Sequence, residues 1–193
     1  MDLTEGTKEQ KIKLSKKMML WFGIISMVMV FAGLTSAYVV SKNRPDWISD
    51  FQLPSVMFWS TAVIIISSIT FILAKRSIAK NNRKNTSIFL LLTLALGLIF
   101  VVLQFEGFSK IVSEGYYFTG SESTVTTSFI YVLVLTHLAH LAAGLIVLLV
   151  VIYNHFKQRY NPGQMLGLEL GATFWHFLDV VWVYLFVFLY FVK

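Results

Sequence analysis

The chain carries its most reactive side chains near the C-terminus, inside a long apolar run that holds His176 and Asp179 between Trp175 and Trp182. An imidazole can bind a metal or haem and changes charge near neutral pH, and a carboxyl group inside a membrane can relay protons. An ionisable residue at mid-membrane also costs roughly 2.5 to 3.5 kcal/mol. We therefore expect Asp179 to face protein or trapped water and to have a hydrogen-bond partner. The possible partners are His176, Trp182 and Thr136.

The spacing of these residues predicts which way they face. At about 100° per residue, Trp175, Asp179 and Trp182 fall on one helical stripe at i, i+4 and i+7. Phe186 continues this stripe, and His176 lies beside it. Two tryptophans in line with a carboxyl group predict a face that packs against another helix.

Two further histidines, His137 and His140, lie three residues apart in another apolar run. At about 1.5 Å per residue, His140 and His176 reach the same third of a ~30 Å hydrocarbon core, so a haem held by both is geometrically allowed. The chain has no cysteine, which excludes disulfides, iron–sulfur clusters and thiolate metal sites. The carboxylates do not follow the pattern of a non-haem iron site. We expect no metal or haem in this chain, but a hydrogen-bonded network that joins helices. A proton-linked role is the second interpretation.

The composition is that of an integral membrane protein. Hydrophobic residues make up 56% of the 193 residues and charged residues only 13%, with a mean hydropathy of +0.71. The net charge of +6 does not indicate a nucleic-acid partner, because the basic residues gather at the ends of the apolar runs.

Five apolar runs are long enough to cross a bilayer as helices. The sequence therefore predicts an all-α fold, a single membrane domain over residues 17–193, preceded by a polar cytoplasmic tail over residues 1–16. The first run is too long for a signal-peptide core and is expected to be retained. Ser67, Ser68 and Thr70 in the second run are expected to hydrogen-bond to other helices or to their own backbone. The predicted spans are 18–40, 55–74, 86–105, 125–153 and 171–192.

The distribution of lysine and arginine predicts the orientation. Of the 16 basic residues, five precede residue 18, five lie in 75–84 and two in 157–159, all on one side of a five-span chain. The other side receives only Lys42, Arg44, Lys110 and Lys193. By the positive-inside rule the N-terminus is cytoplasmic and the C-terminus extracytoplasmic.

The run from Phe174 to Trp182, Phe-Trp-His-Phe-Leu-Asp-Val-Val-Trp, resembles the Tyr-Trp-His-Phe-Val-Asp-Val-Val-Trp signature at the end of subunit III of haem-copper cytochrome c and quinol oxidases. The segment from Thr136 to Gly144, with its two histidines, is similar to a Thr-Gly-x-His-x-x-His-x-x-x-Gly region of that family. Glu169 resembles a family glutamate shortly before the Trp-His pair. The chain departs from the family at Met27, where many members carry a membrane-buried glutamate.

This resemblance implies a short, five-helix bacterial form without the first two of the family's seven helices. Such a subunit lies in the bacterial cytoplasmic membrane and holds no haem or copper, which belong to the partner subunit. It packs against oxidase subunits I and II, binds phospholipid in a cleft and supports proton uptake; other respiratory complexes are further candidate partners. The residues expected in its polar network are His137, His140, Glu169, Trp175, His176, Asp179 and Trp182.

Several alternatives stay open at this point. A subunit III-like protein of nitric oxide reductase or of a quinol oxidase would have the same helix pattern. A small transporter could use Asp179 and the histidines as a proton relay, and a b-type cytochrome would hold haem between them. Co-purifying subunits distinguish the first group, and an optical spectrum distinguishes the last.

Overall fold

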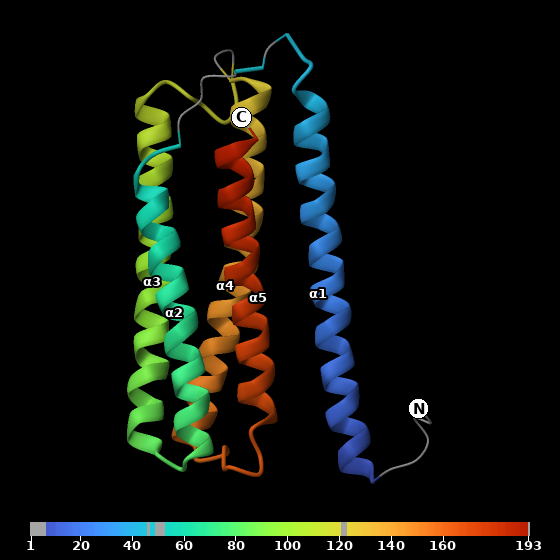
Figure 1. Ribbon diagram of the computed structural model, residues 1–193, viewed down its shortest axis with the longest axis vertical. Helices are drawn as coiled ribbons and strands as arrows, with labels where there is room; N and C mark the ends of the chain where they lie inside the picture. The colour runs from blue at the N-terminus through green and yellow to red at the C-terminus, as the bar shows by residue number, and fades with distance from the viewer. Residues whose placement is uncertain (1–6, 46, 49–52, 121–122, 193) are drawn as a thin grey trace.

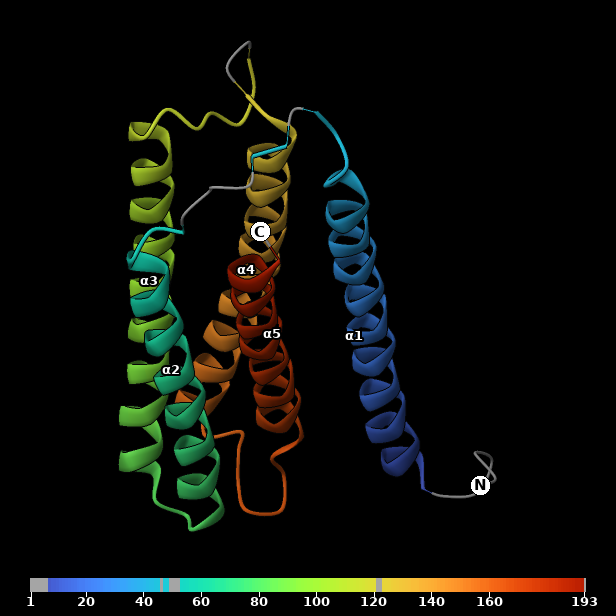
Figure 2. The ribbon, with the colours of Figure 1, turned by 45° about the horizontal axis from the view of Figure 1, so that its top comes forward.

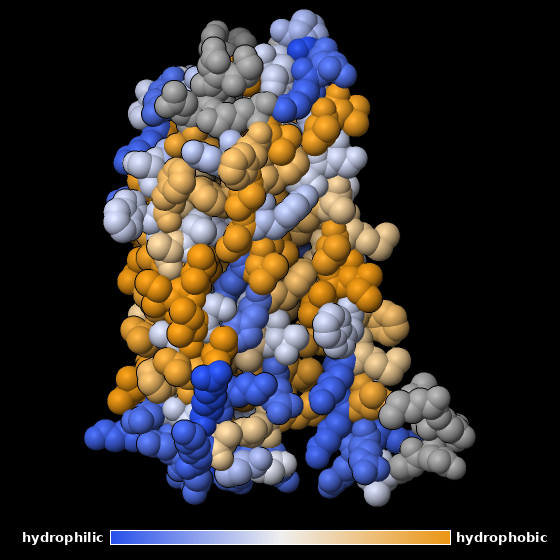
Figure 3. Space-filling model, viewed as in Figure 1, coloured by the Kyte–Doolittle hydropathy of each residue, from blue (hydrophilic) through white to orange (hydrophobic). Residues whose placement is uncertain are grey.

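Five long helices make up nearly all of the computed structural model, which describes residues 7–45, 47–48, 53–120 and 123–192 (Figure 1). Each is long and apolar enough to cross a membrane, as predicted. On the face shown in Figure 3, apolar residues cover the middle of the molecule and hydrophilic residues gather at both ends. The helices are α1 (Lys8–Ser41), α2 (Val56–Ala79), α3 (Arg83–Ser113), α4 (Val125–Phe156) and α5 (Leu166–Phe191).

The helices alternate in direction, so the two ends of the chain lie at opposite ends of the bundle (Figure 1). The start of α1, the α2–α3 connection and the α4–α5 connection share one end. That end therefore collects the basic residues of 8–17, 75–84 and 157–159. The assignment of this end to the cytoplasm rests on the charge count and stays a prediction.

Each helix extends beyond at least one end of its predicted span, and α1, α3 and α4 begin with a side-chain cap. α1 begins at Lys8, so residues 8–16 are helical and continuous with the first span. The polar tail predicted for 1–16 stays a prediction, and residues 1–6 of it lie outside the described residues. Thr7 and Gln10 form a capping box there, in which the Thr7 hydroxyl accepts from the Gln10 amide at 3.4 Å and the Gln10 side chain accepts from the Thr7 amide at 3.0 Å. Asn82 caps the start of α3. The length of an apolar run predicts only the part of a helix inside the hydrocarbon core. The backbone hydrogen bonds of the helix continue into the polar flanks.

Four helices pack as a bundle and α1 stands partly apart from it (Figure 2). The most extensive contact joins α2 to α3, and α4 and α5 pack together against that pair. α1 contacts α4 and α5 mainly through its second half. There the Tyr38 ring lies against Trp47 at 4.8 Å and Phe188 at 5.3 Å between ring centroids, and the Tyr184 hydroxyl donates to the Thr35 hydroxyl at 3.1 Å.

Candidate functional site in the bundle interior

The predicted stripe on α5 is the face that packs inside the bundle. Trp175 and Trp182 are each 1% exposed and Asp179 is 4% exposed. The two indole groups bond to α2. Trp175 donates to the Ser67 hydroxyl at 3.2 Å, and Trp182 donates to the Thr61 hydroxyl at 3.0 Å. A buried indole N–H needs an acceptor, so these two bonds fix the register of α5 against α2.

The two hydroxyl groups of α2 that accept these bonds donate in turn to backbone carbonyls. Ser67 donates to the Thr93 carbonyl of α3 at 3.4 Å, and Thr61 donates to the Met57 carbonyl of its own helix at 2.8 Å. Two further buried pairs join α2 to α3. In one, the hydroxyl groups of Thr70 and Thr93 lie 2.8 Å apart. In the other, the side-chain amide of Gln104 donates to the Ser60 hydroxyl at 2.8 Å. The serines and threonines of α2 thus bond to neighbouring helices and to their own backbone, as predicted.

Two glycines let side chains of α5 pack closely against α3 and α4. A Cβ atom placed on Gly97 of α3 would lie 2.8 Å from the Trp175 ring, and one on Gly144 of α4 would lie 2.6 Å from Leu178 and 3.6 Å from Trp175. Close approach of helices at glycine is typical of membrane bundles. Gly97 therefore makes room for the indole of Trp175, and Gly144 makes room for the side chain of Leu178.

His176 bonds to α2 beside this face. Its Nδ1 lies 2.6 Å from the Ser68 hydroxyl, a pair separated by 108 residues in sequence. A serine beside a histidine can serve as a nucleophile and its base. Here no carboxylate orients the ring, because both Asp179 oxygens are without a hydrogen-bond partner in the described part of the chain. The pair is best interpreted as an interhelical hydrogen bond.

Asp179 does not bond to the three partners considered from sequence. The Trp182 N–H is directed to Thr61, and the His176 Nδ1 is directed to Ser68. Thr136, whose carbonyl bonds to His140, makes no hydrogen bond to the carboxyl group either. The helical period placed Asp179 on the correct face, but it does not determine which side chain of the next helix lies opposite.

The two histidines of α4 have different surroundings. His137 is 1% exposed, lies 5.2 Å from the Trp182 ring and 6.2 Å from the Phe100 ring between centroids, and neither of its ring nitrogens has a hydrogen-bond partner among the described residues. His140 bonds through Nδ1 to the Thr136 carbonyl of its own helix at 2.7 Å. The predicted network therefore includes His176, Trp175 and Trp182 in bonds between helices, but not His137, His140 or Asp179.

The structure does not bring His140 and His176 together as a haem pair. The His140 ring packs on Phe31 of α1 at 5.6 Å, whereas the His176 ring packs on Phe71 of α2 at 6.0 Å between centroids. The residues that the structure describes also contain no group of three His, Cys, Asp or Glu side chains that could hold a metal ion. The chemistry of this site is that of helix packing.

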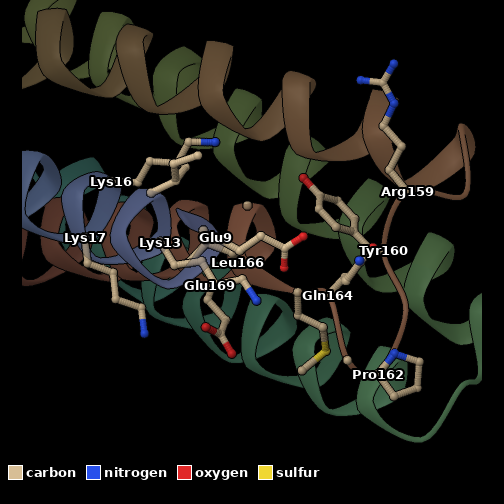
Figure 4. Close-up of a pocket in the computed structure, with 14 residues that line it drawn as sticks. Glu9, Lys13, Lys16, Lys17, Arg159, Tyr160, Pro162, Gln164, Leu166 and Glu169 are labelled. Carbon is tan, nitrogen blue, oxygen red and sulfur yellow. The ribbon is translucent and has the colours of Figure 1, made fainter. Parts of the chain in front are cut away.

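Glu169 lies away from this interior site, in the first turn of α5. It lines a cleft of about 430 Å³ between the start of α1 and the α4–α5 connection (Figure 4). The cleft is also lined by Lys13, Lys16, Lys17 and Arg159. Burial raises the pKa of the Tyr160 phenol in its wall, so that ring contributes no charge.

Arg83 holds the wall of this cleft in place. Its guanidinium donates to the Tyr160 carbonyl at 3.3 Å and to the Asn161 side chain at 2.8 Å, which ties the α4–α5 connection to the start of α3. Arg83 and Tyr160 are 77 residues apart in the sequence, and their contact was not predicted from the sequence.

Comparison with known proteins shows the family of this chain. The family model described as cytochrome c oxidase subunit III matches residues 3–193. The chain belongs to the cytochrome c oxidase subunit III family. It is thus a multi-pass membrane protein of a haem-copper oxidase complex with other subunits, and subunit III of such oxidases lacks redox cofactors.

Curated members of the subunit III family match over most of this chain. Cytochrome c oxidase subunit 3 of Bacillus sp. (strain PS3) is 30% identical over 88% of this chain and 82% of its own length. Cytochrome bo(3) ubiquinol oxidase subunit 3 of Buchnera aphidicola is 30% identical over 97% of this chain and 92% of its own length. Cytochrome c oxidase subunit 3 of Loxodonta africana is 36% identical over 86% of this chain but 66% of its own length, so the chain spans about two thirds of that relative.

Proposed function

We propose that this chain is a non-catalytic, cofactor-free subunit III that packs against subunits I and II of a bacterial terminal oxidase in the cytoplasmic membrane. The haem and copper belong to the partner subunit, and this subunit supports proton uptake there. The observation that carries the proposal is the use of the polar residues on α2 and α5. Trp175, Trp182 and His176 each bond to a hydroxyl of α2, so they join helices and leave no set of groups arranged for catalysis in the described part of the chain.

Mild detergent extraction tests this assignment. We expect the tagged chain to co-purify with the haem- and copper-containing subunits of one oxidase. The isolated chain should show no haem absorption. An oxidase assembled without the chain should take up protons more slowly and lose activity sooner during turnover. A chain that migrates alone from native membranes contradicts the proposal and favours a small transporter, while nitric oxide reductase subunits in its place would assign it to that enzyme.

A quinol-oxidase form is the second candidate. The relative from Buchnera aphidicola carries ubiquinol oxidase in its name, and 92% of its length aligns with this chain. The two forms differ in their electron donor. Oxygen consumption by the purified complex with ubiquinol or with reduced cytochrome c as the only donor distinguishes them.

We further propose that an anionic phospholipid headgroup occupies the basic cleft at the end of α1. Lys13, Lys16 and Lys17 approach the cleft from α1, with Glu9 and Glu169 among them (Figure 4). Arg159 stands at its rim. The cleft lies at the level of the helix ends, where headgroups are found, and each basic residue there contributes about 1 kcal/mol of attraction to anionic lipid.

Removal of two of these charges should release the lipid. For the double variant Lys13→Gln and Lys16→Gln we expect roughly 30-fold weaker retention of anionic phospholipid, corresponding to about 2 kcal/mol. Phospholipid bound per purified complex is measured by mass spectrometry after equal detergent washing. The matched control is Lys80→Gln with Lys84→Gln, which removes the same charge at the same end of the bundle but outside the cleft. Equal lipid loss in both variants would indicate a general surface attraction and no bound headgroup.

A further inference from the structure

A second basic pocket, of about 370 Å³, lies where the end of α2 meets the start of α5. It is called the α2–α5 pocket below. Lys75 and Arg76 of α2 and His176 of α5 line it, and it shares only Met165 with the basic cleft at the end of α1. The rest of its wall consists of Thr173 and three apolar residues, Ile72, Ala79 and Ala172. The pocket therefore combines basic groups with an apolar wall.

The described lining of the α2–α5 pocket is basic and contains no carboxylate. The basic cleft at the end of α1, in contrast, includes Glu9 and Glu169 among its lysines. The side chains of Lys75 and Arg76 have no hydrogen-bond or ion-pair partner in the part of the chain that the structure describes. Two such cations at the end of a membrane helix attract an anion. The charge of the pocket thus indicates an anionic ligand.

His176 supplies a third polar group, deeper in the same pocket. Its Nδ1 lies 2.6 Å from the Ser68 hydroxyl and its ring packs on Phe71, so the orientation of the ring is fixed. When Ser68 donates to Nδ1, the ring hydrogen is on Nε2, which then donates to an acceptor in the pocket. Ser68 precedes Lys75 by seven residues, or roughly 10 Å of helix, so this donor lies nearer the middle of the membrane than the two cations.

We propose that the α2–α5 pocket binds one anionic phospholipid, with its phosphate between Lys75 and Arg76 and an ester carbonyl accepting from Nε2 of His176. A phospholipid carries its ester carbonyls on the acyl side of its phosphate, which is the order in which the pocket presents its donors. Inorganic phosphate has acceptors at one depth only, and it has no part that fits the apolar wall. The inference goes beyond the proposed function and does not depend on it, because this chain alone forms the pocket.

Lipid titration of the native complex tests the phosphate contact. The delipidated complex is titrated with dioleoylphosphatidylglycerol, and bound lipid is counted by native mass spectrometry. For Lys75→Gln with Arg76→Gln we expect one bound molecule to be lost, with its affinity lowered roughly 30-fold. The matched control is Lys80→Gln with Lys84→Gln, which removes the same charge at the same end of the bundle outside both pockets and should keep this molecule. Equal losses in the two variants would overturn the inference.

An ether-linked phosphatidylglycerol tests the contact with His176, because it keeps the phosphate but has no ester carbonyl. We expect the original complex to bind the ester lipid roughly three- to thirty-fold more tightly, the range for one hydrogen bond inside a membrane. His176→Phe keeps a ring beside Phe71 but removes the donor, so it should bind both lipids equally. Each protein is compared with itself, so a general loosening of the bundle does not produce this result. An original complex that does not distinguish the two lipids contradicts the proposal.

Crosslinking identifies the occupant directly. A photoreactive phenylalanine analogue replaces Ile72, which is 38% exposed in the wall of the pocket. In the native complex, placed in a bilayer of equal parts phosphatidylglycerol and phosphatidylcholine, we expect it to crosslink mainly to phosphatidylglycerol. A crosslink to another protein subunit would show that protein fills the pocket, and release of the lipid by inorganic phosphate would show a site for free anions. Either result, or equal labelling of the two lipids, overturns the inference.

Discussion

Replacement of Trp182 by alanine should strongly destabilise the bundle. The indole is 1% exposed, packs edge-on against Phe100 at 5.0 Å between centroids, and donates to Thr61 across the helix pair. Truncation leaves a cavity in a dense core and removes the donor from the Thr61 hydroxyl. Such changes cost about 3 to 5 kcal/mol in protein cores. The measurement is the midpoint temperature at which the solubilised protein loses its monodisperse peak in size-exclusion chromatography.

Two variants make this result specific. Trp182→Phe keeps most of the ring volume but cannot donate to Thr61, so we expect a smaller loss, about 0.6 to 2 kcal/mol. Trp59→Ala removes the same side chain from the outside of α2, where the residue is 71% exposed, and should change the midpoint little. A loss as large for Trp59→Ala as for Trp182→Ala would show that the tryptophans act through the surrounding detergent or lipid and not through the core.

Gly97→Val is the second substitution with a large expected effect. A Cβ atom at this position would lie 2.8 Å from the Trp175 ring, closer than Cβ atoms approach in folded proteins, and 3.2 Å from Leu145, which is also a tight contact. Trp175 cannot easily turn aside, because its N–H is bound to Ser67. Overpacking of this kind costs about 1 to 3 kcal/mol. We expect a lower midpoint in the same chromatographic assay.

The control for Gly97→Val is Gly33→Val. Both glycines lie inside long helices, so both variants pay the same penalty for a β-branched residue. No atom lies within 4 Å of a Cβ built on Gly33. The isolated chain should therefore tolerate Gly33→Val. If Gly33→Val proves as destabilising as Gly97→Val, helix propensity and not the fit of Trp175 would explain the loss.

The sequence alone was sufficient to predict the five helices and the side of α5 that is buried in the bundle. Long apolar runs have few alternatives in a membrane, and the period of the helix places Trp175, Asp179 and Trp182 on one side without further information. The resemblance of the run from Phe174 to Trp182 then identified the family, which the match over residues 3–193 confirms.

The pairing between helices could not be predicted in the same way. Trp182 and Thr61 are 121 residues apart, and His176 and Ser68 are 108 apart. Such contacts depend on how far one helix is shifted along another, which a helical period does not encode. The sequence therefore indicated that Asp179 needs a partner but suggested partners that are bound elsewhere. The unpartnered carboxyl became visible only once the neighbouring donors were placed.

The uneven attachment of α1 has a mechanical consequence. Its second half is fastened at Thr35 and by the aromatic contacts of Tyr38, whereas its first half leaves the bundle (Figure 2). Phe31 also packs on His137 and His140, and Ile24 is buried, so the contacts of α1 reach back to the middle of the helix. A small tilt about Ile24 is carried along eight residues, roughly 12 Å at 1.5 Å each, before it reaches Lys16. We therefore expect the width of the basic cleft to depend on what occupies it.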